Sequence, residues 1–499
     1  MTIGRSGDEA DTLGYCRGMP DRFQHHRLDL SARLGANGIA IIPAATETIR
    51  NDDVTHEFRQ DSDFFYLTGF HEPEALAVIA PGHPEGDYHL FVRPRDRDQE
   101  IWNGYRAGVD GARERFQADQ AYEVGQIDSV LARLMLGRET IHYRVGNPAL
   151  DPRVVGLVGK ARNYHARTGK TMPFTISDLS PTFAEMRLRK STTEIESLRA
   201  ACELSAEGHR EAIRFARPGL YEYQVQAAME YVWREGGSRR NGYPSIVASG
   251  PNACILHYVE NDREIEDGDL VLIDAACEVD HFSSDITRTF PANGRFSGPQ
   301  RAIYEIVLAA QRASIAASQP GATIRTPHET SIRIITEGLI DLGLLPLGID
   351  DSIAMHHYRE FFMHGTSHWL GLDVHDAGSY RIEGKPRVLE PAMSFTVEPG
   401  IYVDQREEIE FPRLTHDLDD WLERILVEGA SARSELDKLK AEADKIRHPI
   451  PEAFRGIGVR IEDDILITED GHENLSRLVP SAIDDIEALA AEESWLIRA

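Results

Sequence analysis

Cysteine is scarce in this chain of 499 residues, which contains only four: Cys16, Cys202, Cys254 and Cys277. No two of them are spaced as C-x-x-C, and four thiols in so long a chain do not make a disulfide framework. The simplest interpretation is that all four are reduced, as is usual in a cytosolic protein.

Long hydrophobic runs are also missing. The longest apolar segments, such as LVLID at 270–274, fall far short of the roughly 20 residues that a membrane-spanning helix needs. The first residues, MTIGRSGDEADT, are acidic and lack the apolar stretch of a secretory signal. We therefore expect a soluble, cytoplasmic protein with no membrane partner.

Positive charge is in deficit. The chain has 54 basic and 82 acidic side chains, a net charge of -28. Such a chain has no overall attraction for phosphate backbones, so nucleic acid is not an expected partner. Its hydrophobic content of 41% is that of a folded globular protein, and its length predicts two domains.

The predicted organisation begins with a polar tail at 1–18 and an α/β domain at 19–185. Three apolar segments closed by proline or glycine predict strands in that domain, at 38–44, 75–82 and 88–94. A second domain, 188–499, begins with a helix in which Thr193 and Glu196 have the spacing of a capping box.

The second domain contains signs of an internal repeat. Arg199-Ala200 and Pro218-Gly219 recur 102 residues later as Arg301-Ala302 and Pro320-Gly321, each time in the order helix, Pro-Gly, helix. This pattern suggests two related halves. Between and after the helix pairs we expect strand-rich stretches at 243–257, 269–290, 361–376, 393–403 and 456–468.

One segment interrupts this order. Residues 404–450 are highly charged but carry apolar residues at helical spacing, which predicts an inserted helical hairpin with one apolar face. We expect the insertion to be peripheral, although it would also suit a lid, a groove wall or an oligomer contact. Its apolar residues are Leu418, Trp421, Leu422, Ile425 and Leu426, followed by Leu436, Leu439, Ala443 and Ile446.

Two aspartates stand in strand-like sequence. Asp274 ends the apolar run LVLID, and Asp285 follows in SSDITRTF. A turn between the two strands would bring both carboxylates together, and a divalent cation would relieve their repulsion. The alternative is that Asp285 pairs with Arg288 while Asp274 caps a turn.

Three histidines follow in FFMHGTSHWLGLDVHD: His364, His368 and His375. The glycines between them argue against a regular helix and favour close backbone packing around a site. Neutral imidazoles suit both transition-metal binding and proton transfer.

Two glutamates complete a candidate set. Glu398 lies in MSFTVEPGIYV and Glu462 in GIGVRIEDD, each beside an apolar strand. Four carboxylates and one imidazole suit Mn²⁺-like ions, with Zn²⁺ or Co²⁺ as alternatives. The residues alone therefore predict a carboxylate-rich metal site, formed by Asp274, Asp285, His368, Glu398 and Glu462.

The motifs together resemble a known family. The stretch ILHYVEND…GDLVLIDAACEVDHFSSDITRTFPANG, with HGTSHWLGLDVHD, TVEPGIY and GVRIEDD in the same order, is similar to the Xaa-Pro aminopeptidases (aminopeptidase P) and to the related prolidases. EFRQDSDFFYLTGFHEPEA and EIWNGYRAG resemble the family's amino-terminal domain. The resemblance covers most of residues 19–480. It implies a small α/β domain followed by a pseudo-symmetric pita-bread domain, an α/β (α+β) fold.

The resemblance also implies a dinuclear site. Asp285 and Glu462 would bridge two divalent ions, most commonly Mn²⁺, while Asp274 completes one ion and His368 with Glu398 the other. A metal-bridging hydroxide would attack the bond before a proline at the second position of a peptide, with Glu398 as proton shuttle.

Further roles follow from the same resemblance. His257 and His364 would donate hydrogen bonds near the scissile bond, and the substrate amine would lie near Asp274. The predicted substrate-binding residues are His257, His364, His375, Tyr402, Arg460 and Trp102. For Arg460 the alternative is a role in orienting Glu462, for Tyr402 ordinary packing, and for Trp102 an ordinary aromatic. The family also implies a homo-oligomer, a dimer or a tetramer.

Two other functions stay open at this point. A prolidase restricted to Xaa-Pro dipeptides is the main alternative, because an insertion that blocks long peptides would favour dipeptides. A non-catalytic pita-bread binding protein is the other, although the presence of all five ligand types argues against it.

Overall fold

The computed structural model describes residues 20–414, 421, 424–425 and 427–497. The chain divides into two compact units, the first ending at Met186 and the second beginning at Arg187, so that the division falls within α7 (Ser180–Leu188). Each unit is described by itself below.

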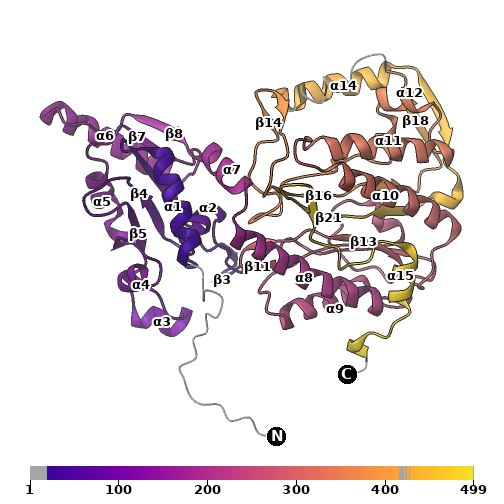
Figure 1. The fold of residues 1–499 in the computed structure, drawn as a ribbon, viewed down its shortest axis with the longest axis horizontal. Helices are drawn as coiled ribbons and strands as arrows, with labels where there is room; N and C mark the ends of the chain where they lie inside the picture. Colours follow the sequence, from indigo (N-terminus) through magenta and orange to yellow (C-terminus); the bar gives the residue numbers. More distant parts are fainter. Residues whose placement is uncertain (1–19, 415–420, 422–423, 426, 498–499) are drawn as a thin grey trace, which may run out of the picture. The chain divides into compact units, whose positions relative to one another are not determined.

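The first unit is built on a six-stranded mixed sheet with the strand order β6-β5-β4-β1-β7-β8 (Figure 1). The strands predicted at 38–44, 75–82 and 88–94 are confirmed as β1, β4 and β5. The strands are β1 (Gly38–Pro43), β2 (Ile49–Asn51), β3 (Val54–Thr55), β4 (Leu76–Ile79), β5 (Tyr88–Val92), β6 (Gln120–Glu123), β7 (Thr140–Tyr143) and β8 (Thr175–Asp178). The helices before α7 are α1 (Pro20–Leu34), α2 (Ser62–Thr68), α3 (Arg97–Asn103), α4 (Gly108–Glu114), α5 (Ile127–Leu134) and α6 (Asp151–Thr168).

Apolar residues on both faces of β1 explain why this strand is central. Ile39 and Ile41 belong to one core with Leu131 of α5 and Val154 of α6. Helices α1 and α2 pack against β1 as well. Because successive side chains of a strand point to opposite faces, a run such as Gly-Ile-Ala-Ile-Ile is buried only when both faces are covered.

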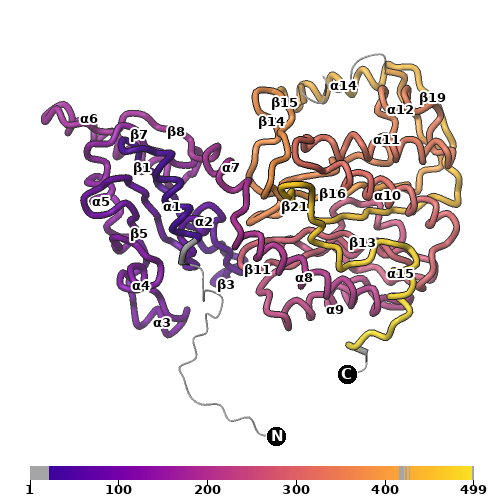
Figure 2. The backbone as a smooth tube through the Cα atoms, viewed as in Figure 1, coloured from indigo at the N-terminus to yellow at the C-terminus, as the bar shows by residue number. Residues whose placement is uncertain are grey.

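The second unit contains the two predicted helix pairs. Helix α8 (Thr192–Phe215) packs against α9 (Glu222–Glu235), and α10 (Gly298–Ala317) packs against α11 (Thr326–Asp341). Figures 1 and 2 show each pair side by side around the strands of this unit. The two helix pairs predicted from the repeated Pro-Gly pattern are therefore confirmed. Shorter helices are α12 (Ile349–Ala354) and α15 (Ile483–Ala490).

The strands of this unit form small antiparallel sheets, with the orders β13-β10-β9, β16-β21-β22 and β17-β20. A single bridge between Thr287 and Glu462 joins the first sheet to the segment that enters β21. The strands are β9 (Ile246–Ser249), β10 (Leu270–Asp274), β11 (Glu278–Val279), β12 (Phe282–Ser283), β13 (Thr287–Pro291), β14 (Arg381–Ile382), β15 (Lys385–Pro386), β16 (Ser394–Val397), β17 (Gly400–Val403), β20 (Ile457–Arg460), β21 (Asp463–Ile467) and β22 (His472–Asn474).

One of the five strand-rich predictions is wrong. Residues 361–376 form no named strand, and their only ladder contact is an isolated bridge from Trp369 to Phe395. Gly371 explains part of the irregularity, because a Cβ there would lie 2.2 Å from a carboxylate oxygen of Asp376. The segment instead bonds locally to β16, where the Thr396 amide donates to the His368 carbonyl at 3.0 Å.

The insertion at 404–450 is helical at the described residues 421, 424–425 and 427–428 and again at 430–442, as predicted, but its two ends form strands, which corrects the prediction of a helical hairpin throughout. It begins and ends with an antiparallel pair, β18 (Glu408–Pro412) and β19 (Lys445–Pro449), around helix α14 (Ala430–Glu442). The strand at β18 follows from the alternation that buries Ile409 and Phe411. Ile446 accordingly lies on a strand, opposite Phe411.

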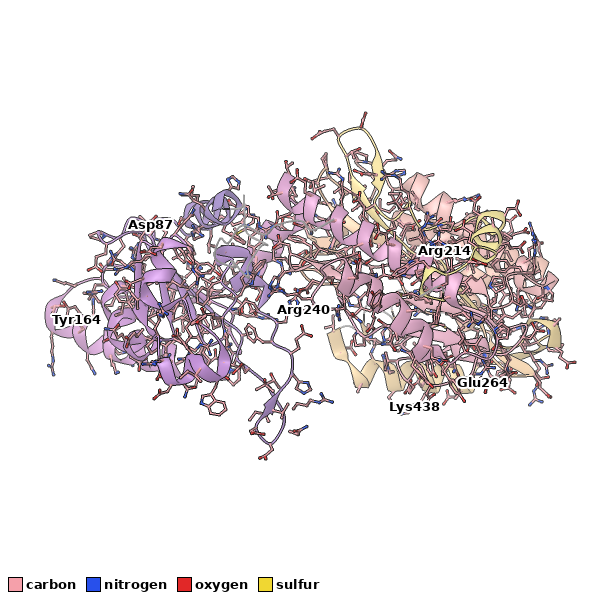
Figure 3. All side chains as sticks on the ribbon, turned by 90° about the horizontal axis from the view of Figure 1, so that it is seen from below. Asp87, Tyr164, Arg214, Arg240, Glu264 and Lys438 are labelled. Atoms are coloured by element: carbon pink, nitrogen blue, oxygen red, sulfur yellow. The ribbon has the colours of Figure 1, made fainter. Side chains whose placement is uncertain are left out.

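The predicted apolar face of the insertion forms a small core of its own. Trp421 and Leu436 pack together with Leu414, while exposed charged residues such as Lys438 occupy the outer face of α14 (Figure 3). Ile425, Leu439 and Ala443 pack against this core. Leu418, Leu422 and Leu426 lie outside the described residues. None of the described helices is both long enough and apolar enough to cross a membrane.

Candidate metal centre

Of the five residues predicted from the sequence to bind metal, four lie at separate strand ends of the second unit. Asp274 ends β10, Asp285 precedes β13, Glu398 follows β16, and Glu462 lies between β20 and β21. His368 belongs to the irregular segment that packs on β16. The antiparallel pairing of these short strands brings residues that are almost 190 positions apart to one place.

The distances join the five residues into one cluster. His368 Nε2 lies 3.3 Å from Asp285 Oδ2 and 3.5 Å from Glu398 Oε1. Asp285, His368 and Glu462 offer ligand atoms that all lie within 4.8 Å of one another. The Tyr243 hydroxyl connects Asp274 Oδ1 at 2.7 Å and Asp285 Oδ1 at 2.5 Å.

The proton count at Tyr243 shows that the cluster fits a cation. A phenol carries one proton and donates it to one carboxylate at a time. Only one of its two short contacts with Asp274 and Asp285 can use that proton. The other contact needs either a proton on the carboxyl group or a cation that takes the place of this proton. A set rich in carboxylates with one imidazole is the donor chemistry that Mn²⁺, Zn²⁺ or Co²⁺ accepts.

Burial and mutual repulsion act on the carboxyl groups. Burial, reinforced by the charge of Asp274, raises the pKa of Asp285 well above its ordinary value. Burial, reinforced by Asp285, does the same to the pKa of Glu462. Burial and then Glu462 raise the pKa of Glu398 to about 8. Without cations the cluster therefore holds protons at neutral pH.

Thr287 and Arg460 fix the orientation of two of the clustered carboxylates through hydrogen bonds. The Thr287 hydroxyl donates to Glu462 Oε2 at 2.6 Å and accepts from Arg460 Nε at 3.2 Å. Arg460 Nη2 also donates to Asp274 Oδ2 at 2.6 Å. Arg288, the alternative partner of Asp285, instead pairs with Asp463 at 2.6 Å and donates to the Glu462 carbonyl. The predicted alternative of an Asp285–Arg288 pair is therefore excluded.

A hydrogen-bonded chain leads from Arg460 to His364. Arg460 Nη1 donates to the Tyr402 hydroxyl at 2.8 Å, and His364 Nε2 lies 2.8 Å from that hydroxyl. His364 Nδ1 lies 2.7 Å from the carbonyl of Gly365, which only accepts. Nδ1 thus carries the proton and Nε2 accepts from Tyr402. Burial, followed by the charge of Arg460, lowers the pKa of His364 to about 3.

The remaining predicted residues differ in position. The exposed imidazole of His375 lies 4.2 Å from that of His368, centroid to centroid. His257 is exposed, and its charge contributes to lowering the pKa of both His364 and His375, after burial and nearer groups. Tyr402 and Arg460 are 2% and 4% exposed, which favours the alternatives of packing and orientation over direct contact with a peptide. Trp102 lies on α3 of the first unit and is 84% exposed, and its role stays a prediction.

Sequence reasoning missed Tyr243 and Thr287. Thr287 was open to detection, because it stands two positions after Asp285 and so shares its face of the strand. Tyr243 lies in NGYPS, a loop whose composition predicts only a turn. Nothing in its neighbourhood marks it as a partner of two carboxylates.

Comparisons with known proteins match both units. The model of Metallopeptidase family M24 matches residues 196–469, and that of the Aminopeptidase P N-terminal domain matches residues 23–142. The first range contains all five clustered residues.

Individual proteins match along nearly the whole chain. Xaa-Pro aminopeptidase of Escherichia coli K12 is 40% identical over 468 residues, which cover 94% of this chain and 97% of that protein. The structure of Pseudomonas aeruginosa aminopeptidase PepP is 45% identical with a TM-score of 0.84, covering 95% of this chain and 98% of that one. Zn-substituted E. coli Aminopeptidase P in complex with product has a TM-score of 0.83 at 40% identity, covering 94% of this chain and 98% of that one. The chain therefore belongs to metallopeptidase family M24 and has the two-domain organisation of the aminopeptidase P branch.

Proposed function

We propose that this protein is a metal-dependent Xaa-Pro aminopeptidase, which releases the first residue of peptides with proline at the second position. The observation that carries the proposal is the cluster of Asp285, His368 and Glu462, joined by Asp274 and Glu398, in an M24 chain. Relatives that match over almost the full length bear the name Xaa-Pro aminopeptidase.

The five clustered residues would hold two divalent ions, for which we propose Mn²⁺. Oxygen donors outnumber nitrogen donors four to one in this set, which favours a harder ion than zinc. Asp285 and Glu462, which together with His368 offer ligand atoms within 4.8 Å of one another, would bind both ions. Divalent ions supply an acidified water and polarise the peptide carbonyl when bound.

Glu398 is the proton carrier of the proposal. Its carboxyl group belongs to the cluster, with Oε1 3.5 Å from His368 Nε2. Such a carboxyl group can take up a proton and return it to the proline nitrogen as that bond breaks. His364 Nδ1, whose proton is donated to Gly365, lies 3.4 Å from Glu398 Oε2.

The exposed histidines are the groups available to a peptide. Both ring nitrogens of His364 are engaged, by Gly365 and Tyr402, so its predicted role as a donor to the substrate needs a rearrangement of that chain. His257 makes no hydrogen bond within the described part of the chain, which leaves its ring free to donate to a substrate carbonyl. Asp274, held by Arg460 and Tyr243, would bind the peptide amine.

A homo-oligomeric, cytoplasmic protein belongs to the proposal as well. The 84% exposure of Trp102 supports an assembly in which another subunit covers this side chain. Cys202, Cys254 and Cys277 are free thiols, which supports a reducing compartment. Light scattering of the purified protein would give the size of the assembly.

The decisive experiment is hydrolysis of Ala-Pro-Ala and Ala-Pro in the presence of Mn²⁺, with the products identified and Asp285→Asn as control. We expect free alanine from the tripeptide, and none from the variant. Activity on the dipeptide alone would make the protein a prolidase. Absence of hydrolysis with metal bound would favour the non-catalytic binding protein.

A further inference from the structure

The sheet of the first unit has a point at which the direction of its connections reverses. From β1 the chain proceeds outward through β4, β5 and β6, and then returns to place β7 and β8 on the other side of β1. Strands β1, β7 and β8 are parallel to one another. In open α/β sheets, the crevice at the carboxyl ends of strands at such a point is the usual position for a ligand.

A cavity of about 450 Å³ lies at this point. Its lining includes Pro43 at the end of β1, Arg144 and Asn147 directly after β7, and Leu179 directly after β8. Every lining residue belongs to the first unit, so no residue of the metal centre contributes to the cavity. Its volume is within the range of small-molecule sites.

The charged lining consists of one positive group, Arg144, and two carboxylates, Asp61 and Asp63. Arg144 makes no hydrogen bond or ion pair with any residue that the structure describes. Asp61 uses Oδ1 to accept from the Phe64 amide at 2.9 Å, and its Oδ2 has no partner among the described residues. Asn147 accepts two amides of its own loop through Oδ1, so its NH₂ group is left to donate.

Three buried apolar side chains contribute to the lining. Ile41, Leu179 and Phe183 are 0%, 1% and 3% exposed, and they contribute to the wall of the cavity. A ligand that suits this lining has a carboxylate for Arg144, an ammonium group on the side of Asp61 and Asp63, and an apolar side chain for the wall.

We propose that this cavity binds a small zwitterion with an apolar side chain, either a free amino acid or a short apolar peptide. Multiply charged anions such as phosphate esters are disfavoured, because the lining has a single arginine beside the carboxylates of Asp61 and Asp63, in a chain whose net charge is -28. The inference does not depend on the proposed peptidase activity.

Calorimetric titration of the full-length protein tests the proposal, with L-leucine and Leu-Leu as the two probes. L-Leucinamide lacks the carboxylate, and 4-methylpentanoate lacks the ammonium group. We expect saturable binding of L-leucine or Leu-Leu, and binding at least about tenfold weaker for both analogues. The stronger of the two probes identifies the ligand as amino acid or peptide.

Three variants locate the binding. Arg144→Met removes the guanidinium from an exposed position without breaking a bond, and we expect about tenfold weaker binding of the zwitterion but not of leucinamide. Asp61→Asn keeps the oxygen that caps α2 and should weaken binding of the zwitterion but not of 4-methylpentanoate. The matched control, Arg162→Met on the exposed face of α6, should bind as the parent does.

Asp285→Asn separates this cavity from the metal centre. We expect that variant to bind L-leucine as the parent does. Binding that is lost in Asp285→Asn and unchanged in Arg144→Met would place the probe at the metal centre and overturn the proposal. So would the absence of saturable binding by every probe.

Discussion

Thr287 shows how one hydroxyl positions a bridging carboxylate. It donates to Glu462 and accepts from Arg460, and it is fully buried. Outer groups of this kind fix the direction of a metal ligand. We expect Thr287→Val, which keeps the shape of the side chain, to lower metal affinity by about 10- to 100-fold. Titration of the metal-free variant with Mn²⁺ measures the loss.

Thr289 provides the matched control. It is equally buried on the same face of β13, but its hydroxyl bonds the backbone carbonyl and amide of Arg460 rather than a metal ligand. Thr289→Val should cost about 1–3 kcal/mol of unfolding free energy and leave metal affinity unchanged. Equal losses of metal affinity in the two variants would contradict a specific role for Thr287.

His89 makes the stability of the first unit sensitive to acid. His89 is fully buried, and its Nε2 donates to the Gly86 carbonyl at 2.9 Å. Burial, followed by the charge of His83, lowers the pKa of His89 from 6.5 to about 4. The unfolded chain therefore binds a proton before the folded one, and stability is lost as pH falls from 6.5 toward 4, by up to about 3 kcal/mol.

His89→Gln should remove the contribution of His89 to this dependence, because a neutral amide still donates to Gly86, whereas His209, whose pKa burial also lowers to about 4, keeps its own contribution. Chemical denaturation at about pH 7 and about pH 4.5 measures the change in stability for parent and variant. His165→Gln, at an exposed position on α6, is the control and should retain the full pH dependence. A variant His89→Gln with the parent's pH dependence would show that other groups are responsible.

Among the elements, the insertion has a core that is independent of the metal centre. Trp421 is 8% exposed, packs on Leu436 and lies 4.2 Å from the guanidinium of Arg424. The insertion leaves β17 at Val403, which pairs with Ile457, whereas Glu398 and Glu462 flank the opposite end of the β17–β20 ladder. This register supports a peripheral position.

Trp421→Ala should therefore loosen the insertion without impairing hydrolysis. Removal of a large buried aromatic costs about 3–5 kcal/mol where the cavity cannot collapse. We expect faster proteolytic cleavage within 404–450, measured by mass spectrometry, and an unchanged rate on a tripeptide. The exposed Val427 gives the control, Val427→Ala. A large fall in the rate for Trp421→Ala alone would indicate that the insertion contributes to the active site.

The strands and helices show where sequence patterns are sufficient. The helix pairs and β1 were predictable because their apolar periodicity is strong and each ends at proline or glycine. The prediction of the capping box of α8 was wrong by two residues. The box is formed by Ser191 and Glu194, not by Thr193 and Glu196. The sequence STTEIE contains both spacings, and only the tertiary position of the helix start selects one.

The acidic residues of the candidate site were predictable from the sequence, but the hydrogen bonds around them were not. Acidic residues at the ends of apolar strands signal a site because an isolated carboxylate is costly there. Tyr243 and the Arg460–Tyr402–His364 chain were not predictable, because their contacts join strands far apart in sequence and no spacing encodes them. The prediction of strand structure at 361–376 was wrong for a related reason. The backbone of this segment bonds to β16, which is distant in sequence, and it does so without a regular ladder.

At the scale of the whole molecule, metal binding links stability to pH. In the metal-free protein, burial and mutual repulsion raise the pKa of Asp285 and Glu462, and that of Glu398 to about 8. The folded state thus keeps protons that the unfolded chain releases near its ordinary carboxyl pKa of about 4. The metal-free second unit accordingly loses stability as pH rises from about 5 to about 8.

Metal ions require the deprotonated carboxylates and displace these protons, so their stabilising effect must grow over the same range. We expect the rise in melting temperature produced by saturating Mn²⁺ to be small at about pH 5.5 and several degrees larger at about pH 8. Calorimetric scans with Mn²⁺ and with chelator measure the difference, and Asp285→Asn, which removes a central ligand, should show almost none at either pH. An equal rise at both pH values in the parent would mean that the carboxyl groups are already ionised in the metal-free fold. The short contacts of Tyr243 with both aspartates would then require a different source of balancing charge.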